Sequence, residues 1–337
     1  MTQATEKFDV VGIGNAIVDV LSPANDALLA ELGLPKGSMT LIDEDAARRI
    51  YARMEDGVEC SGGSAANTIA GLASFGSAAA FIGKTRNDDL GAVFARDIRA
   101  MGVTFRTPPA GDGAPETARC LVLVTPDAQR TMGTFLGASV LLGPDDIDQD
   151  LIRASRVTYL EGYLWDPPQA KDAFLLAMDI AHGAGNKVAL SLSDPFCVAR
   201  YRAEFRRLAE TQVDILFANE HEITSLYETE DFDAALQAIR GRCEIAVLTR
   251  SEKGSVIVTA DAVHEIPAHP VAKVVDTTGA GDLYAAGFLH GLTRGHDLPH
   301  CGRLAARAAA EVISHYGARP ETPLDRLVAE RSAANPA

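Results

Sequence analysis

The chain has 337 residues, 47% of them hydrophobic, so it can build a sizeable core as one large domain or two small ones. Its formal net charge of −15 disfavours a nucleic-acid partner, and an anionic substrate would need a local cluster of positive groups. The five scattered cysteines lack a CxxC pair and the eight histidines lack metal-ligand spacing, so we expect neither a disulfide framework nor a zinc site. The sequence has no leader-like start and no membrane-spanning run, so we expect a soluble cytoplasmic protein with no membrane partner.

Short apolar runs alternate with helical patterns along most of the chain. Strands are expected at 8–14, 78–84, 157–163, 188–192, 215–218, 246–249 and 255–259. Helices are expected at 65–75, 90–101, 170–183, 234–241, 283–292 and 304–313. Several strands are almost continuously apolar, which is typical of strands buried on both faces. The alternation predicts an α/β fold with a mostly parallel, doubly covered sheet.

Two segments break this alternation. Residues 15–62 contain a polar, strand-like stretch at 37–43, and residues 104–137 contain strand patterns at 120–125 and 130–136 bounded by Pro, Gly and Asp. We expect these two segments to form a small, discontinuous β lid. The remaining ranges, 1–14, 63–103 and 138–330, would form the α/β core that binds nucleotide and substrate.

The most informative motif is Asp276–Asp282, which reads DTTGAGD and precedes an apolar helical run. Small residues let the backbone approach a ligand closely, and the first turn of a helix presents free N–H groups to an anion. Asp282 beside such an anion could accept a proton, which is the arrangement that phosphoryl transfer to a hydroxyl requires. The alternative is a Gly-rich turn in which Asp282 is an ordinary acid of a helix N-terminus.

The region after the first strand offers a second candidate site. Gly12 and Gly14 invite a dinucleotide-binding interpretation, but the third glycine of that fingerprint would fall on Ile17, which disfavours it. Asn15 and Asp19 together supply a donor/acceptor pair and a carboxylate that could grip vicinal hydroxyls. Turn and capping chemistry is the alternative for both.

Two further motifs open helices. Gly62 and Gly63 precede the helix expected at 65–75, and Asn67 lies on its first turn, although Gly-Gly-Ser is also ordinary cap chemistry. The stretch Asn219–Glu222 follows an apolar strand, where Glu222 could order waters around Mg²⁺ or could simply be a helix-terminal acid. No GxxxxGK[ST], HRD or DFG pattern occurs, which excludes a P-loop and a protein kinase.

In their order and wide spacing, these motifs resemble those of the ribokinase/phosphofructokinase-B superfamily of small-molecule kinases. The resemblance covers nearly the whole chain and implies a Rossmann-like, ribokinase-like core with a β lid. Within the superfamily the chain is most similar to adenosine kinases. That likeness implies ATP-dependent phosphorylation of the 5′-hydroxyl of a nucleoside, adenosine first.

The resemblance also implies roles for particular residues. Asp282 would be the catalytic base, and the N–H groups of Gly279, Ala280 and Gly281 would stabilise the transferring group. Substrate contacts are implied for Asn15, Asp19, Gly63, Ser64, Asn67 and the lid arginine Arg130, with Met39, Leu41, Tyr163 and Trp165 as candidates for the base pocket. Tyr163 and Trp165 could instead be packing residues.

Cofactor contacts follow from the same likeness. ATP contacts are implied for Asn219, Thr249, Ser251, Gly254, Gly279 and Gly281. Ser251 stands where the family often has glycine. Glu222 would bind Mg²⁺ through water, and the loop around Asp276 and Thr278 resembles a region that binds K⁺ in relatives.

Two alternatives remain open at this point. A sugar kinase of the ribose or fructose type would share the polar cup of Asn15 and Asp19. A non-catalytic ligand-binding or regulatory protein could have kept the fold, although retention of Asp282 and the anion cradle disfavours it. The sequence leaves the oligomeric state open between monomer and dimer.

Overall fold

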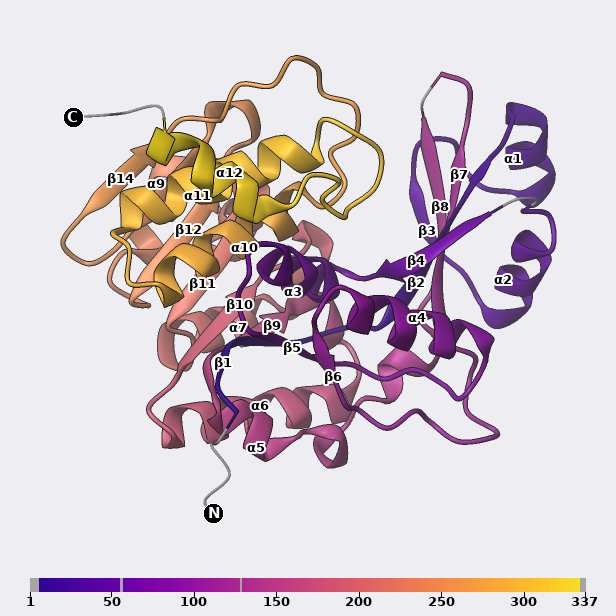
Figure 1. Cartoon of the computed structure of the whole chain (residues 1–337), viewed down its shortest axis with the longest axis horizontal. Helices are drawn as coiled ribbons and strands as arrows, with labels where there is room; N and C mark the ends of the chain where they lie inside the picture. Colours follow the sequence, from indigo (N-terminus) through magenta and orange to yellow (C-terminus); the bar gives the residue numbers. More distant parts are fainter. Residues whose placement is uncertain (1–5, 55–56, 128, 334–337) are drawn as a thin grey trace.

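A nine-stranded sheet forms the centre of the computed structural model, which describes residues 6–54, 57–127 and 129–333 (Figure 1). Its strand order is β14-β13-β12-β11-β10-β9-β1-β5-β6. The strands are β1 (Phe8–Ile13), β5 (Ala79–Ile82), β6 (Thr104–Phe105), β9 (Ser155–Glu161), β10 (Lys187–Ser191), β11 (Ile215–Asn219), β12 (Ile245–Thr249), β13 (Ser255–Val258) and β14 (Val263–Ile266). All pair in parallel except β12 with β13 and β13 with β14.

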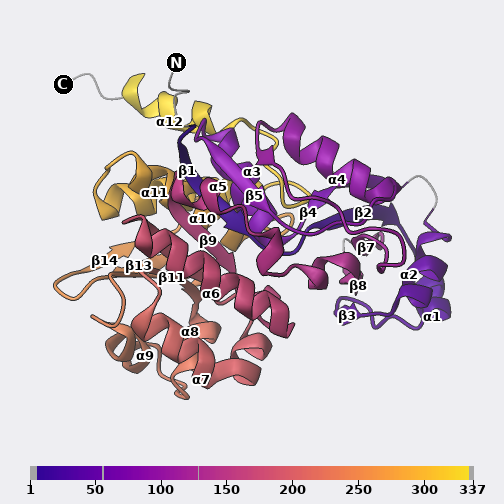
Figure 2. The same ribbon diagram turned by 90° about the horizontal axis from the view of Figure 1, so that it is seen from below.

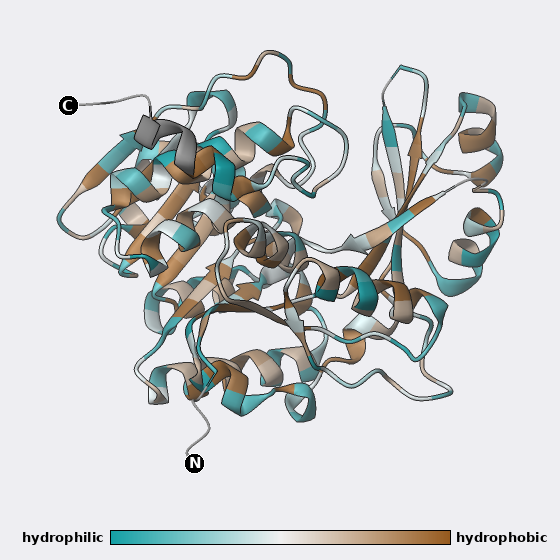
Figure 3. Cartoon of the chain, viewed as in Figure 1, coloured by the Kyte–Doolittle hydropathy of each residue, from teal (hydrophilic) through white to brown (hydrophobic). Residues whose placement is uncertain are grey.

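Helices cover both faces of this sheet. One face packs against α3 (Ser64–Ser74), α4 (Asp89–Ala100), α10 (Ala280–Thr293), α11 (Leu298–Val312) and α12 (Leu324–Ala333). The other packs against α5 (Gln149–Arg153), α6 (Pro168–Gly183), α7 (Pro195–Thr211), α8 (Glu220–Leu226) and α9 (Phe232–Ile239). Val10 belongs to the first apolar cluster and Val11 to the second, because successive side chains of a strand point to opposite faces. Hydrophobic residues accordingly gather on the central strands (Figure 3).

A second, five-stranded sheet lies at one end of the molecule (Figures 1 and 2). Its order is β3-β8-β7-β2-β4, formed by β2 (Ile17–Pro23), β3 (Met39–Leu41), β4 (Val58–Gly62), β7 (Ala118–Val124) and β8 (Arg130–Phe135). Helices α1 (Asp26–Leu32) and α2 (Glu44–Tyr51) lie beside it. All five strands come from the two segments expected to form a lid, which supports that proposal. We place its second boundary after β6, because β6 pairs with β5 in the large sheet.

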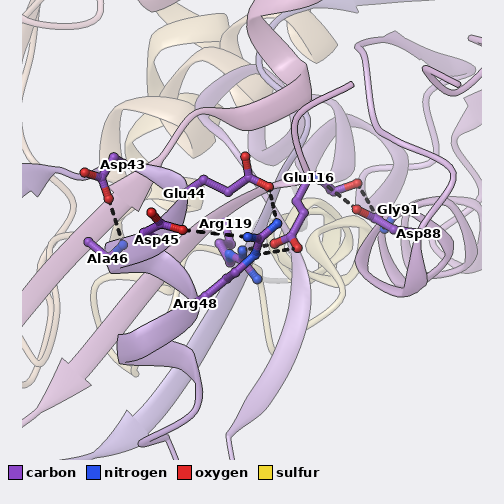
Figure 4. Close-up of polar contacts among 10 residues, drawn as sticks. Asp43, Glu44, Asp45, Ala46, Arg48, Asp88, Gly91, Glu116 and Arg119 are labelled. Atoms are coloured by element: carbon purple, nitrogen blue, oxygen red, sulfur yellow. Dashed lines mark hydrogen bonds and ion pairs between the residues drawn. The ribbon is translucent and has the colours of Figure 1, made fainter. Parts of the chain in front are cut away.

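Charged side chains attach α2 to the second sheet (Figure 4). Arg48 of α2 donates through Nε to Glu116 Oε1 at 2.9 Å and through Nη2 to Glu44 Oε1 at 2.6 Å. Arg119 of β7, whose residue is only 4% exposed, pairs with the other oxygen of Glu116. One carboxylate therefore links the helix to a buried arginine of the sheet.

The expected strands and helices of the large sheet are present, most within one to three residues of the predicted bounds. One expected strand is too long: the chain leaves β9 at Glu161, and Gly162–Trp165 is a 3₁₀ turn. Other 3₁₀ turns are Gly137–Leu141, Pro144–Asp146 and Ser251–Lys253. No helix within the described ranges is long and apolar enough to cross a membrane.

Candidate active site

The candidate residues gather at the carboxyl ends of the parallel strands. Asn15 follows β1, Glu161 ends β9, Asn219 ends β11 and Thr249 ends β12. In an open α/β sheet this edge is where ligands bind. The first turns of α3 and α10 reach the same place, because Ser64 and Asn67 of α3 contact Asp282 of α10.

Asp282 lies between two donors from α3. Its Oδ1 accepts a hydrogen bond from Ser64 Oγ at 2.6 Å, and its Oδ2 accepts one from Asn67 Nδ2 at 2.9 Å. Burial raises the pKa of Asp282, while these two hydrogen bonds and Arg319 lower it. The other amide atom, Asn67 Oδ1, is buried without a partner among the described residues. A buried acceptor of this kind calls for a donor, which a ligand hydroxyl would supply.

The turn before α10 leaves two of the three N–H groups of the expected anion cradle without an acceptor among the described residues, and one expectation is wrong. Gly279 has φ 79°, in the left-handed region that favours glycine, and a Cβ there would collide with Ala318. The N–H of Ala280, expected to face an anion, instead donates to Thr277 O at 3.2 Å, because the turn closes before the helix begins. In the described part of the chain no acceptor contacts the N–H of Gly279 or Gly281, and the space in front of Gly281 is open.

Asp19 lies on β2, in the middle of a row of side chains across the second sheet. Its register partners are Cys60 on β4 and Cys120 on β7, and the row continues to Thr134 on β8 and Leu41 on β3. Directly paired residues point to the same face of a sheet, so these five side chains share one face. Burial raises the pKa of Asp19 to about 6, against the opposing effects of Arg319 and Arg130. A Cβ on Gly62 would collide with the Asp19 carboxylate, so glycine is required beside it.

An apolar depression of about 290 Å³ continues this row. Its lining residues come from the second sheet and the turn after it: Leu41, Ile42, Pro115, Thr134, Phe135, Leu136, Gly137 and Val140. Two inter-strand spacings separate Thr134 from Asp19, a distance of ~10 Å. One face of the lid sheet therefore combines a carboxylate with an apolar surface.

Asn15 is 2% exposed and has both ends of its amide engaged. Its Nδ2 donates to Glu161 Oε1 at 2.6 Å, and its Oδ1 accepts from Ser139 Oγ at 2.8 Å. The carboxylate of Glu161 also accepts the N–H of Ala65 at 2.8 Å, and burial raises its pKa to about 7. Glu161 is absent from the sequence-derived site, although an acid at the end of an apolar strand was a usable signal.

Arg130 contacts the loop before α10. Its Nη1 lies 2.6 Å from Asp276 Oδ2 and donates to Thr278 Oγ1 at 2.8 Å. Its Nε and Nη2 are buried without a partner in the described ranges. Gly317 N also donates to Asp276 Oδ2, and Thr278 donates twice to Oδ1. All lone-pair directions of Asp276 are therefore used, and this arrangement does not fit K⁺ binding by that carboxylate.

Glu222 is held in a capping box with Asn219. Its Oε1 accepts Asn219 Nδ2 at 2.6 Å and its Oε2 accepts Asn219 N at 2.9 Å, while Asn219 Oδ1 accepts Glu222 N at 2.9 Å. Burial raises the pKa of Glu222 to about 7. No group of three or more His, Cys, Asp or Glu among the described residues could hold a metal ion. The donor set therefore fits only a metal bound chiefly by phosphates and water, as Mg²⁺ often is.

The loop after β12 shows why glycine suits the position that Ser251 occupies here. Ser251 has φ 51°, in the left-handed region where glycine is preferred. Gly254 has φ 86°, and a Cβ there would collide with the carbonyl of Ile266. Thr249 at the strand end is half-buried, and Ser251 is exposed.

The four candidates for the base pocket differ in exposure. Tyr163 is 40% exposed, and Met39 and Leu41 on β3 are 50% and 57% exposed, so all three are accessible to a ligand. Trp165, expected near the base, is 2% exposed and packs against Phe174 and Phe205 in the core. It is a packing residue.

Comparison with known proteins identifies the family. Residues 39–325 match the pfkB family of carbohydrate kinases. This chain belongs to that family. Its members and the related adenosine kinases are phosphotransferases that act on hydroxyl groups, so this protein is one too. Kinases of this family use ATP with a divalent metal, and they bind small sugar or nucleoside substrates.

Three relatives show that this chain is similar both to adenosine kinases and to a probable sugar kinase. The crystal structure of adenosine kinase from Sinorhizobium meliloti is 51% identical, with a TM-score of 0.89 over 97% of this chain and 100% of that chain. The structure of a probable sugar kinase protein from Rhizobium etli CFN 42 is 48% identical, with a TM-score of 0.90 over 97% of this chain and 99% of that chain. The adenosine kinase of Saccharomyces cerevisiae is 26% identical over 94% of this chain and 98% of its own length. The expected ribokinase-like fold is confirmed.

Proposed function

We propose that the protein is a nucleoside kinase that phosphorylates the 5′-hydroxyl of adenosine to give AMP, a reaction of purine salvage in the cytoplasm. The observation that carries this proposal is the row on the lid sheet. Asp19 and an apolar depression share one face, ~10 Å apart, as a ribose and an attached purine would require. A bare sugar has no use for the apolar half of this surface.

Asp282 is proposed as the catalytic base. As the substrate oxygen bonds to the γ-phosphorus, the hydroxyl proton passes to the Asp282 carboxylate and the bond from phosphorus to the ADP oxygen breaks. The free N–H groups of Gly279 and Gly281 face the charge on the transferring group, together with the positive end of α10. The unpaired donors Nε and Nη2 of Arg130 are available to the same anion.

Ribose recognition is proposed for Asp19 and for the turn before α3. The Asp19 carboxylate can accept two hydroxyl hydrogen bonds, and Asn67 Oδ1 can accept one more. Gly63 has φ 94° and lies against the carbonyl of Asn15, which brings the backbone of Gly63 and Ser64 close to the ligand. Asn15 contributes through the second hydrogen of its side-chain Nδ2, since the first already bonds Glu161 and its Oδ1 already accepts from Ser139.

The nucleotide is proposed to lie along Asn219, Thr249, Ser251 and Gly254, at the ends of β11 and β12. The chemistry that Mg²⁺ supplies, neutralisation of phosphate charge, would come with the nucleotide, and Glu222 would contact its waters. The Asp276 carboxylate has no place for K⁺, because Arg130, Thr278 and Gly317 already donate to it.

A sugar kinase is the second candidate. The similarity to the probable sugar kinase of Rhizobium etli favours it, and the polar cup of Asn15 and Asp19 suits a free sugar equally well. A panel of nucleosides and sugars, assayed for ATP-dependent ADP release, tests both, with the product identified by phosphorus NMR. Formation of a nucleoside 5′-monophosphate supports the proposal. Turnover of sugars alone would replace it by the second candidate.

A further inference from the structure

Arg319, in the loop between α11 and α12, reaches back to the turn at Gly62 and Gly63. Its Nε and Nη2 both donate to the carbonyl oxygen of Ser61, at 3.0 and 2.7 Å, and Nη2 also donates to Ser61 Oγ at 3.0 Å. Its Nη1 donates to the carbonyl oxygen of Ala66 at 2.6 Å. One side chain therefore holds the end of β4 and the first turn of α3, on the two sides of the glycine turn.

That turn sets the position of the groups that bond Asp282. Ser64 and Asn67, its two hydrogen-bond donors, lie immediately beyond the glycines. On the other side, the N–H of Ser61 donates to Asp97 Oδ2 at 2.6 Å. The N–H of Ser61 is thus bonded to Asp97, and its carbonyl oxygen is bonded to Arg319. A shift of Arg319 would move the donors of Asp282.

Arg319 also contributes charge. The charged and titratable groups that face Asp19 and Asp282 are Arg319 from the loop after α11, Arg130 from β8, Glu161 and Tyr159 from β9, Tyr163 from the turn after β9, Glu222 from α8, and Cys60 and Cys120 from β4 and β7. Burial raises the pKa of both carboxylates, and Arg319 opposes that rise at both. Arg130 opposes the rise at Asp19 as well.

We propose that Arg319 is a positioning residue of the phosphoryl-transfer site: its guanidinium fixes the Gly62–Gly63 turn, and its positive charge acts on the carboxylates of Asp19 and Asp282. The inference rests on the proposed function, because it takes Asp282 as the base. Arg319 does not contact the carboxylates directly; it acts through Ser61, Ala66 and the field of its charge. A residue that only packs the loop would change neither turnover nor titration.

Two substitutions separate these contributions. Arg319→Gln removes the charge, and we expect a ~10-fold or larger loss of kcat, since small misplacements of reacting groups are costly. The acidic limb of its pH–rate profile should move upward by ~1 pH unit, because a nearby cation lowers a carboxylate pKa. Arg319→Lys keeps the charge but cannot donate two parallel hydrogen bonds to Ser61. Its kcat should therefore fall, while the acidic limb of its pH–rate profile stays at the wild-type pH.

A matched control exists in Arg99, which places the same fork, Nε and Nη2, on the carbonyl oxygen of Phe105 at 3.1 and 2.8 Å. Arg99→Gln should change neither kcat nor the limb. If Arg319→Gln matches the wild type in both, or loses only thermal stability, the proposal is overturned. Should Arg319→Gln fail to fold, an Arg319→Lys variant with wild-type kcat would overturn the positioning role by itself.

A readout without substrate separates this inference from the proposed function. Carbon NMR of aspartate carboxyls, assigned with Asp19→Asn, gives the pKa of Asp19 in the protein alone, expected at about 6. Arg319→Gln should raise it by ~1 unit, and Arg319→Lys should leave it close to the wild-type value. An unchanged titration in Arg319→Gln contradicts the inference. A wild type that turns over no nucleoside but shows the shift contradicts only the proposed function.

Discussion

Arg130 and Asp276 join the lid sheet to the large domain through an ion pair of 2.6 Å, with side chains that are 11% and 6% exposed. The two residues lie 146 positions apart, one on β8 and the other in the loop that leads to α10. The pair places two unpaired guanidinium donors beside the cradle of Gly279 and Gly281. One side chain therefore links the second sheet to the loop that leads into the proposed anion site.

Removal of the Arg130 charge should lower the stability of the protein as well as its activity. Arg130→Gln leaves the buried Asp276 carboxylate without its cation, and breaking a buried pair from one side costs ~3 kcal/mol. Arg48→Gln is the control, because its side chain is 52% exposed and exposed pairs contribute ~1 kcal/mol or less. Urea denaturation of both variants measures this. Equal, small losses of unfolding free energy in Arg130→Gln and Arg48→Gln would show that the Arg130–Asp276 pair does not stabilise the contact between the lid sheet and the large domain.

Replacement of Asp282 by Asn should abolish turnover while nucleoside binding persists. Loss of a general base typically costs ~10²–10⁴-fold in rate, and the amide would also disturb the hydrogen bonds from Ser64 and Asn67. Ser64→Ala, which removes one of these donors and keeps the carboxylate, should lose far less. Steady-state kinetics and calorimetric titration give the two quantities. Comparable kcat in Asp282→Asn and the wild type would end the assignment of Asp282 as base.

Asp19→Ala should weaken nucleoside binding much more than ATP binding. Each hydrogen bond to a charged group contributes about 1.5–3 kcal/mol, and Asp19 can accept two from the ribose. Cys60→Ala, which changes the neighbour of Asp19 in the same row, is the control. Titrations with adenosine and 2′-deoxyadenosine provide the check. If Asp19→Ala binds both as tightly as the wild type does, ribose is held elsewhere.

Stability and activity should respond to pH in opposite directions. Burial raises the pKa of Asp19, Glu161 and Glu222 to about 6, 7 and 7, above the unfolded values of about 4. Groups with raised folded pKa values stabilise the fold at low pH, and that contribution is lost as pH rises through about 6–7. Turnover should instead increase with pH, because Asp282 must be ionised to accept a proton.

Glu222→Gln isolates one of these groups. Glutamine also completes a capping box with Asn219, so the structure should persist without the titration. The difference in unfolding free energy between pH 5 and pH 8 should shrink by roughly 2 kcal/mol. Asp150→Asn is the control, since that side chain is 96% exposed. An unaltered difference in Glu222→Gln would mean that Glu222 is ionised at low pH in the folded protein.

The sequence predicts the large sheet well because its strands are continuous apolar runs. The structure also brings together Asp282, Ser64 and Asn67, which the sequence picks out because glycine-rich turns before helices let a backbone approach a ligand. The second sheet is harder to predict: Asp19 and Ser22 interrupt the apolar pattern of β2, β4 is short and partly polar, and no local pattern signals their pairing. The row from Cys60 to Leu41 exists only through strand register. Arg319 lies in a loop without periodicity, and its role depends on residues more than 250 positions away.

The central claim is that the acceptor is a nucleoside. Burial of a purine against the apolar depression should gain several kcal/mol, at roughly 25 cal/mol per Å² of apolar area, and each 1.4 kcal/mol is about tenfold in specificity. The most direct test is kcat/KM for adenosine against ribose and fructose at saturating ATP. The account predicts that adenosine is preferred by at least ~10²-fold. A kcat/KM for ribose or fructose equal to or above that for adenosine would contradict it.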